Sequence, residues 1–301
     1  MFQSILDDIK YNFKMGNTVT RIIILNVVIF VIAALIVAFS GMGPGQKGSI
    51  ELFMENNFFI SALPQIFILK PWTLITYMFM HVSFMHILWN MIGLNMFGTI
   101  MGDLLNDRRI MPLYILGGIV GAICYMVAFR FSNGMMGSPM LGASASIMAI
   151  AAATGLVAPD YNIKLLLIGN VKLKYIVLAF VFFDIIGTQG ASNTGGHFAH
   201  LGGLGLGFLF AVILKNGTDI TLPLQKLFSW LSTTGEFNLP LKNRTVMKVK
   251  HRSERLGPKG KMDDQEFDPE RLNRILEKIK VAGYNNLSAE EKDFLNKASR
   301  E

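Results

Sequence analysis

The chain has 301 residues, of which 51% are hydrophobic and only 16% are charged. Soluble domains usually contain about 25% charged residues, so this composition excludes an ordinary soluble protein and indicates a chain that lies in a bilayer. The net charge of +7 does not indicate nucleic-acid binding, because the basic residues lie mainly at the ends of apolar runs and in one tail, as in membrane proteins.

The N-terminal part contains a surface segment, a first membrane helix and an amphipathic stretch. Residues 1–18 have apolar side chains at helical spacing, which predicts a helix lying on the membrane surface. The apolar run Ile22–Ser40 is long enough to span a bilayer. The stretch Ile50–Lys70 is too broken to span and too apolar for water, so we place it partly in the membrane interface.

Five further apolar runs complete an expected bundle of six spanning helices over residues 19–216, so the expected fold class is an all-α membrane protein. A spanning helix needs about 20 residues. Two of the runs are shorter, and we expect them to start below the membrane surface inside the bundle. The five runs are Thr73–Met101, Ile110–Phe129, Ala143–Ala158, Tyr175–Ile186 and His197–Leu214, the third and fourth being the short ones.

Lysine and arginine are unevenly distributed between the two sides of this bundle. If the N-terminus is inside, most of them lie in inner segments, so both termini are expected to be cytoplasmic. Ser144 and His200 then lie near the starts of helices that enter from the outer side, at the same depth. The basic residues of the inner segments are Lys10, Lys14, Arg21, Arg108, Arg109, Lys164, Lys172, Lys174 and Lys215.

The C-terminal part changes character. Residues 217–262 are expected to form an interfacial and basic linker, and residues 263–301 a small soluble helical hairpin in the cytoplasm. Asp268 and Pro269 are typical of the start of its first helix. Ser288 and Glu291 have the spacing of a capping box and predict the start of its second helix.

A serine near the start of a short apolar run is the first candidate for chemistry. Ser144 follows Gly142 and Ala143, which allow a tight helix start. Free backbone N–H groups and the positive end of the helix dipole point toward the first turn, where they stabilise an oxyanion. Taken alone, the segment is more typical of small residues that pack or cap helices.

The last apolar run contains a histidine on a face of glycines. A polar side chain inside a spanning helix needs a partner, and a glycine face lets a neighbouring helix approach closely. If this face packs against small residues of the serine helix, Ser144 Oγ comes within hydrogen-bond reach of His200. The small residues are Gly196, Gly203 and Gly207 beside His200, and Ala151 and Gly155 beside Ser144.

Three nearby polar residues are expected to lie away from this contact. Ser146 lies about 200° round the helix from Ser144. His197 lies about 60° from His200 and nearer the membrane surface, so we interpret it as facing a loop or water. Asp184 could be the third member of a triad, but its place at the outer end of its run favours contact with water or a loop.

The second apolar run contains three more polar candidates. His86 and Asn90 are four residues apart and share a helix face, so they could complete an oxyanion hole or serve as polar contacts between helices. His81 lies about 140° from His86 and is expected to support the outer loop. The histidines could also bind a metal, as in an ion transporter. We predict no metal, because there is no HExxH and no carboxylate lies near them in sequence.

Three motifs occur in a characteristic order. They are His81…His86…Asn90, Gly142-Ala143-Ser144 and Ala199-His200-Leu201-Gly202-Gly203. Together they resemble the rhomboid family of intramembrane serine proteases, of the bacterial type with six transmembrane helices and here a cytoplasmic extension. The resemblance covers residues 20–215, and the family usually has glycine where Ala145 stands.

The resemblance implies an active protease without metal or cofactor. Ser144 would be the nucleophile and His200 the general base, in a dyad without an acidic member, with His86, Asn90 and the Ser144 backbone N–H as oxyanion hole. The substrates would be single-span membrane proteins within the lipid of a bacterial inner membrane, cleaved near the outer surface. The alternative is a non-catalytic rhomboid-like protein that binds client membrane helices. The supporting residues would be His81, Gly142 and Gly203.

Overall fold

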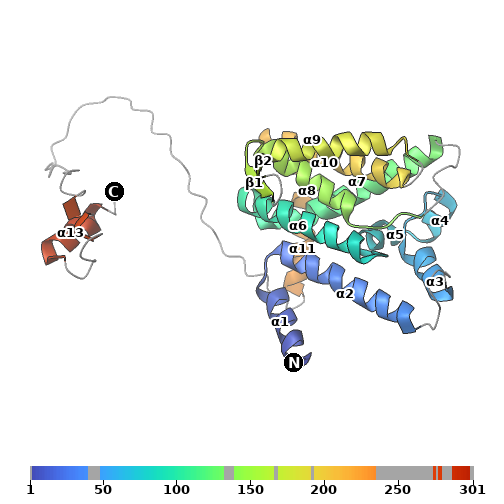
Figure 1. Ribbon diagram of the computed structural model, residues 1–301, viewed down its shortest axis with the longest axis horizontal. Helices are drawn as coiled ribbons and strands as arrows, with labels where there is room; N and C mark the ends of the chain where they lie inside the picture. The colour runs from blue at the N-terminus through green and yellow to red at the C-terminus, as the bar shows by residue number, and fades with distance from the viewer. Residues whose placement is uncertain are drawn as a thin grey trace. The chain divides into compact units, whose positions relative to one another are not determined.

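A computed structural model of the chain describes residues 2–39, 48–131, 139–165, 169–190, 193–234, 274–275, 277–279 and 287–298. The chain divides into two compact units, Met1–Pro240 and Leu241–Glu301. The first is a bundle of helices around the short helix α8, which confirms the expected all-α membrane fold (Figure 1). Its elements are α1 (Phe2–Met15), α2 (Thr18–Phe39), α3 (Ser49–Phe58), α4 (Pro64–Leu69), α5 (Thr73–Thr76), η1 (Tyr77–Phe79), α6 (Phe84–Leu105), η2 (Asp107–Arg109), α7 (Ile110–Phe131), α8 (Ser144–Val157), β1 (Asn162–Leu165), β2 (Gly169–Lys172), α9 (Leu173–Gly187), α10 (Thr194–Lys215) and α11 (Leu222–Thr234).

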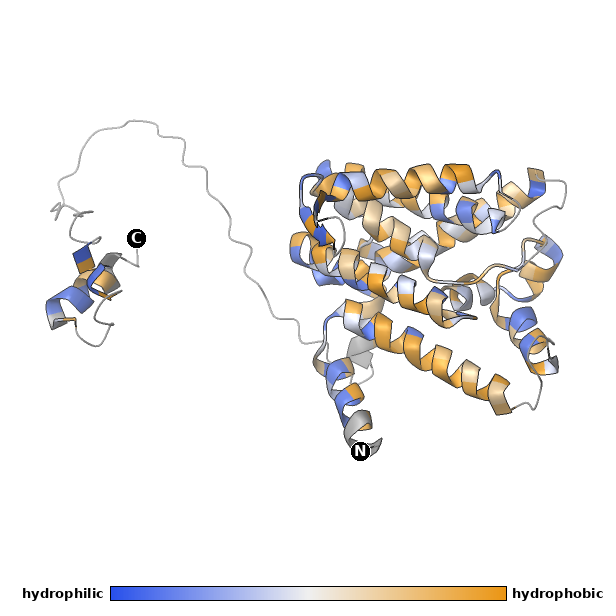
Figure 2. Ribbon diagram, in the orientation of Figure 1, coloured by the Kyte–Doolittle hydropathy of each residue, from blue (hydrophilic) through white to orange (hydrophobic). Residues whose placement is uncertain are grey.

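Within the described residues, four helical segments are long and apolar enough to cross a membrane, namely α2, α6, the segment Asp107–Phe131 that contains α7, and α10. The helices α8 and α9 have only 14 and 15 residues. The six expected spans therefore correspond to four full-length helices and two short ones. Figure 2 shows α2 hydrophobic along almost its whole length. Only 11% of its apolar 18-residue stretch is buried inside the protein, so its side chains are available to lipid. The chain is a multi-pass membrane protein.

The second apolar run is not one helix, and the prediction of a continuous span from Thr73 to Met101 was wrong. The short α5 and η1 are followed by residues 80–83, which lie outside any helix, and α6 begins only at Phe84. Ser83 caps this start, because its Oγ accepts a hydrogen bond from the His86 backbone N–H at 3.2 Å. Apolar content alone did not reveal the break, because extended and helical segments inside a bundle are equally apolar.

The close contact between α8 and α10 depends on two glycines of α10. A Cβ atom on Gly203 would lie 2.1 Å from the carbonyl oxygen of Ala145, and one on Gly207 would lie 2.0 Å from that of Ala149. Neither position can therefore hold a larger residue without moving backbone. The glycine face that the spacing predicted on α10 is thus the surface on which α8 packs.

The small residues of α8 are distributed differently from the prediction. Gly155 faces α9, where a Cβ would lie 2.7 Å from Val177 Cγ2. Ser146 packs against α7, where a Cβ on Gly117 would lie 3.2 Å from its Cα. Because α8 contacts α6, α7, α9 and α10, it needs small side chains all round, and a single small-residue face could not be assigned from spacing.

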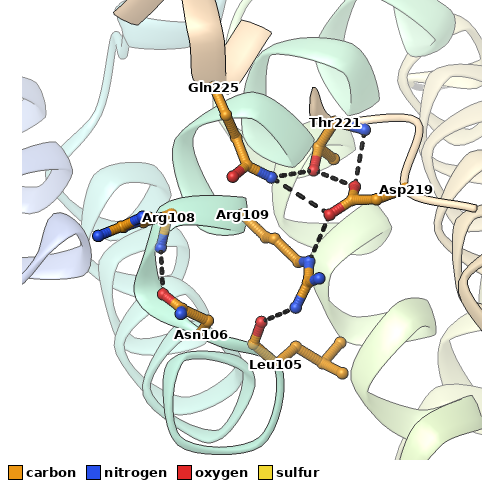
Figure 3. Close-up of polar contacts among 7 residues, drawn as sticks. All are labelled: Leu105, Asn106, Arg108, Arg109, Asp219, Thr221 and Gln225. Carbon is orange, nitrogen blue, oxygen red and sulfur yellow. Dashed lines mark hydrogen bonds and ion pairs between the residues drawn. The ribbon is translucent and has the colours of Figure 1, made fainter. Parts of the chain in front are cut away.

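At the end of the bundle opposite Ser144, a polar network joins the start of α7 to the segment between α10 and α11 (Figure 3). Arg109 Nε donates to Asp219 Oδ2 at 2.7 Å, and Arg109 also donates to the carbonyl of Leu105. The Asp219 carboxylate accepts from the Thr221 backbone N–H at 2.9 Å and from the Thr221 hydroxyl. Burial alone would raise the pKa of Asp219, but the hydrogen bonds from Thr221 and Arg109 outweigh it and lower the pKa below its ordinary value.

We expect this network to make stability depend on pH. A carboxyl group with a lowered folded-state pKa stabilises the fold above its unfolded-state pKa of about 3.9, and that contribution is lost as pH falls through the folded-state pKa. Asp219→Asn should lower the free energy of unfolding by about 1–3 kcal/mol at pH 7. It should also make the unfolding midpoint depend less on pH between pH 7 and pH 3. Thermal unfolding in detergent measures both effects.

Asp160→Asn is the matched control for this prediction. Asp160 accepts from Lys172 and Lys174 at 2.9 Å, but its side chain is 63% exposed, so solvent screens these pairs. The unfolding midpoint at pH 7 should change little. A loss as large as that of Asp219→Asn would show that any lost carboxylate at this end weakens the fold, and would contradict the assigned role of the Arg109 network.

Sequence analysis missed a two-stranded hairpin between α8 and α9. Its strands β1 and β2 are antiparallel, with Asn162 opposite Lys172 and Leu165 opposite Gly169. Lysines and asparagines alternate with apolar residues over only four positions per strand, which is too short a pattern to separate from a loop. The hairpin carries the predicted basic residues of this connection at the same end as Arg109.

In the second unit, the predicted capping box is confirmed. The Glu291 backbone N–H donates to Ser288 Oγ at 3.2 Å, and the Ser288 backbone N–H donates to Glu291 Oε2 at 2.8 Å. The helix α13 (Ala289–Ala298) begins at this box. Of the first predicted helix of the hairpin, residues 274–275 and 277–279 are helical, whereas Asp268, Pro269 and the basic linker 242–261 lie outside the described residues.

Candidate functional site

The structure brings Ser144 and His200 together at one end of the bundle. Ser144 is the first residue of α8, and His200 is the seventh residue of α10. His200 Nε2 lies 2.6 Å from Ser144 Oγ, which is a hydrogen bond between residues 56 positions apart. The contact lies about one turn from the Gly203–Ala145 approach described above, so the glycine of α10 sets the distance between the two helices at this pair.

The turn before Ser144 is made by glycine and is covered by His86. Gly142 has φ +116°, which only glycine adopts without strain. A Cβ on Gly142 would lie 2.8 Å from His86 Cε1 and Nε2, so the imidazole lies directly on this turn. The backbone N–H of Gly142 donates to the Tyr77 carbonyl at 2.9 Å, which ties the turn to the segment preceding α6. His86 therefore lies next to the chain that delivers Ser144.

Asn90 and His81 lie around His86, but not in the arrangement that helix spacing predicted. Asn90 is buried, and its Nδ2 donates to the His86 carbonyl of its own helix at 2.8 Å, without a hydrogen bond to Ser144 among the described residues. The His81 ring packs edge-on against the His86 ring, with centroids 5.0 Å apart. The prediction that His81 points away from His86 was wrong, because His81 lies before the helix start and helical phase does not apply to it.

Asp184 and His197 correct two further expectations. Asp184 does not face water or a loop, since its side chain is only 6% exposed, and its Oδ1 lies 2.8 Å from the Nδ1 atoms of both His200 and His197. His197 therefore contacts this carboxylate, while its side chain stays 25% exposed, so the expectation that it faces water holds only in part. The expected pair of serine and histidine is in fact continued by a buried acid, in the order Ser144, His200, Asp184.

The carboxylate was hard to assign from sequence because its contacts cross two helices. Asp184 lies near the C-terminal end of α9, whereas the two histidines lie in the first two turns of α10. The signal that could have found it was its chemistry, because an ionisable residue inside an apolar run is expected to have a partner. Asp184, His197 and His200 are also the three groups whose ligand atoms lie close enough to hold a metal ion.

A serine, four histidines and a buried carboxylate are gathered at one end of this helical bundle, which defines a membrane protein with a polar site among its helices. Comparison with known proteins gives the family. Residues 69–217 match the rhomboid domain family, and this match contains α6 to α10 with every residue of the site. The chain belongs to the rhomboid family.

Two rhomboid-like proteins are similar over a comparable region. The chain is 29% identical over 200 residues to RHOMBOID-like protein 12, mitochondrial, from Arabidopsis thaliana, which covers 62% of this chain and 59% of that protein. It is 29% identical over 193 residues to Presenilin-associated rhomboid-like protein A, mitochondrial, from Danio rerio, which covers 58% of this chain and 50% of that protein. The matched regions span only 50–59% of the length of these relatives.

We expect Gly203→Ala to disturb both stability and the site. Its Cβ would lie 2.1 Å from the Ala145 carbonyl oxygen, so α8 and α10 must separate. Forcing an extra carbon into a packed contact costs about 1–3 kcal/mol, and the separation should lengthen the 2.6 Å contact between Ser144 and His200. The unfolding midpoint and the rate of labelling of Ser144 by a fluorophosphonate should both fall.

Gly205→Ala is the control from the same helix. A Cβ on Gly205 meets nothing within 4 Å, so this substitution should leave both measurements close to wild type. Alanine also favours the helix over glycine by about 1 kcal/mol. Equal losses in the two variants would mean that any side chain added to α10, and not the approach of α8 to α10, disturbs this segment, because the higher helix propensity of alanine cannot cause a loss.

Proposed function

We propose that this protein is an intramembrane serine endopeptidase. The observation that carries the proposal is the 2.6 Å contact between Ser144 Oγ and His200 Nε2 inside the rhomboid domain. A hydroxyl and an imidazole nitrogen at this distance form the pair of nucleophile and base used in acyl transfer. The substrates would be proteins with one transmembrane segment, because the site lies among apolar helices.

In the proposed reaction, His200 Nε2 takes the proton of Ser144 Oγ as the oxygen attacks the scissile carbonyl carbon. The tetrahedral intermediate collapses to an acyl-enzyme as His200 returns the proton to the leaving amine. The same nitrogen then takes a proton from a water molecule that attacks the ester, and it returns this proton to Ser144 Oγ as the acid product leaves. Asp184 Oδ1, 2.8 Å from His200 Nδ1, accepts a hydrogen bond from the Nδ1–H group and so selects the tautomer whose Nε2 can take the serine proton.

The oxyanion would be stabilised at the start of α8. Ser144 is the first helical residue, so its backbone N–H has no partner within the helix. His86, whose ring covers Gly142, can supply a second donor. Asn90 would reach the oxyanion only by turning its amide away from the His86 carbonyl that it contacts now. We therefore assign the main donors to Ser144 and His86, with Asn90 as a third.

The orientation in the membrane is part of the proposal. The end of the bundle opposite Ser144 carries Arg109, Lys172, Lys174 and Lys215. The positive-inside rule places this end, and with it both termini, in the cytoplasm of a bacterial cell. Cleavage would then take place near the outer surface of the inner membrane. To test this orientation, Cys124 would be replaced and single cysteines introduced at residues 47 and 216. The side of the membrane from which each cysteine is accessible would then be measured.

The experiment that tests the activity uses purified full-length protein in lipid vesicles. A substrate with one transmembrane segment should be cut within or next to that segment, and a fluorophosphonate should label the protein covalently at Ser144. A folded protein that neither cleaves nor is labelled would overturn the protease assignment. It would instead favour a rhomboid-like protein that binds membrane helices without cutting them.

A further inference from the structure

Asp184 and the two histidines beside it form a cluster of three groups that are able to bind a metal ion. Asp184 Oδ1 lies 2.8 Å from His197 Nδ1 and 2.8 Å from His200 Nδ1, and the three ligand atoms all lie within 4.8 Å of one another. The two histidine side chains are 25% and 16% exposed. An ion from solution can therefore reach the cluster, whereas the carboxylate itself is buried.

One atom of this cluster is unsatisfied. Asp184 Oδ2 has no hydrogen-bond partner among the described residues, and the side chain is only 6% exposed, so water does not replace the missing partner. A buried carboxylate oxygen without a partner is destabilising, because it has lost its hydrogen bonds to water and gained none in return. Its neighbour Oδ1 already serves two imidazoles. A further positive group beside the carboxylate would remove this cost.

The backbone is built to bring the second histidine into the cluster. His197 and His200 are three residues apart on α10, so they share one face of the helix. The His197 ring lies on Gly187 at the end of α9, where a Cβ would lie 2.4 Å from its Cε1 and Nε2 atoms. Only glycine at this position lets the ring lie so close to the α9 backbone, beside Asp184. The proposed reaction does not use His197, so it does not explain why this histidine contacts Asp184.

We propose that Asp184, His197 and His200 bind a divalent transition metal, with Zn²⁺ as the best fit, and that this ion inhibits the site. Two imidazole nitrogens and one carboxylate, with water in the fourth position, are a ligand set that suits zinc. At zinc–ligand distances of about 2.0–2.2 Å the ligand atoms would be roughly 3.4 Å apart in a tetrahedron. The present separations require only small rotations of side chains that already converge.

Inhibition follows from the tautomer of His200, and this consequence rests on the proposed protease function. A metal on Nδ1 takes the lone pair of that nitrogen, so the ring proton must sit on Nε2. Nε2 then donates to Ser144 Oγ in place of accepting its proton, and the base is lost. No proton leaves the imidazole in this change, because the proton moves from one ring nitrogen to the other.

Binding is tested first, without any reference to activity. Equilibrium dialysis of the full-length protein in detergent against Zn²⁺ should give one bound equivalent, with an affinity at least about 10-fold weaker in His197→Gln. Ser144→Ala should bind as tightly as wild type, since Ser144 is not a ligand. His251→Gln, which removes a histidine from the C-terminal part, is the control for histidine number and should also bind normally. Absence of saturable binding, or equal binding by His197→Gln, overturns the site.

Inhibition is tested second, as the rate of Ser144 labelling by a fluorophosphonate. Saturating Zn²⁺ should slow labelling of wild type at least about 10-fold, and a chelator should restore it, whereas His197→Gln compared with its own zinc-free rate should be insensitive. Bound zinc without slower labelling overturns the inhibitory role. If the protein lacks protease activity altogether, no zinc-free labelling occurs and dialysis still decides the metal site, so the two failures are distinguishable.

Discussion

Ser144→Ala is expected to lower proteolysis by about 10⁴-fold or more, which is the scale on which serine hydrolases depend on their nucleophile. The substitution removes only the oxygen that lies 2.6 Å from His200 Nε2. The helix start should be unchanged, because Gly142 makes the turn and the Ser144 side chain caps nothing. Cleavage of a single-span substrate in vesicles, followed over time, measures the effect, and the unfolding midpoint verifies that the variant is folded.

The matched control is Ser146→Ala in the same helix. Ser146 is fully buried, and its Oγ has no hydrogen-bond partner among the described residues, so alanine removes an unsatisfied hydroxyl from the contact with α7. Cleavage should stay within about 2-fold of wild type, and stability should be equal or higher. Loss of cleavage in this variant together with normal cleavage by Ser144→Ala would reverse the assignment of the nucleophile.

Asp184→Asn is expected to slow acylation by about 10²- to 10⁴-fold, because an amide in this place can donate to His200 Nδ1 and stabilise the wrong tautomer. In the proposed reaction Asp184 acts through His200, as a positioning residue. Its effect should therefore appear as slower fluorophosphonate labelling of Ser144, with substrate affinity little changed. Asp184→Glu keeps the carboxylate and should recover part of the lost rate.

A purely structural role for Asp184 predicts a different pattern. In that case labelling would slow only in proportion to the loss of folded protein, and Asp184→Glu would be no better than Asp184→Asn. Asp103→Asn, an exposed carboxylate on α6, controls for the loss of one negative charge and should label at the wild-type rate. Normal labelling by Asp184→Asn would return the site to a pair of serine and histidine.

The sequence predicted what depends on the bilayer and on local spacing. Low charge and long apolar runs indicated a helical membrane protein, because lipid demands helices with satisfied backbones. Glycines beside His200 at helical spacing predicted the close face of α10, which Gly203 and Gly207 provide. The start of a helix at Ser144 followed from Gly142, since positive φ and free N–H groups are local properties of the backbone.

Predictions failed where a helix was assumed to continue or a partner lay on another helix. His81 was assigned by helical phase across a segment that is not helical, so its contact with His86 was missed. Helical phase also misplaced Gly155, because α8 is enclosed by helices on every side. The capping box at Ser288 was correct, because both of its hydrogen bonds lie within four residues of chain.

The sequence by itself determined the membrane fold and the residues around which a site would form, because composition, glycine spacing and turn chemistry are local properties of the chain, and its motifs carried the resemblance to the family. Only the tertiary structure decided which carboxylate joins that site. Asp184 comes from α9 and meets both histidines of α10 through a packing angle that no periodicity encodes. The buried acid beside His200, on which the proposed metal site rests, is there because the ends of α9 and α10 meet, and that meeting is a property of the packed bundle.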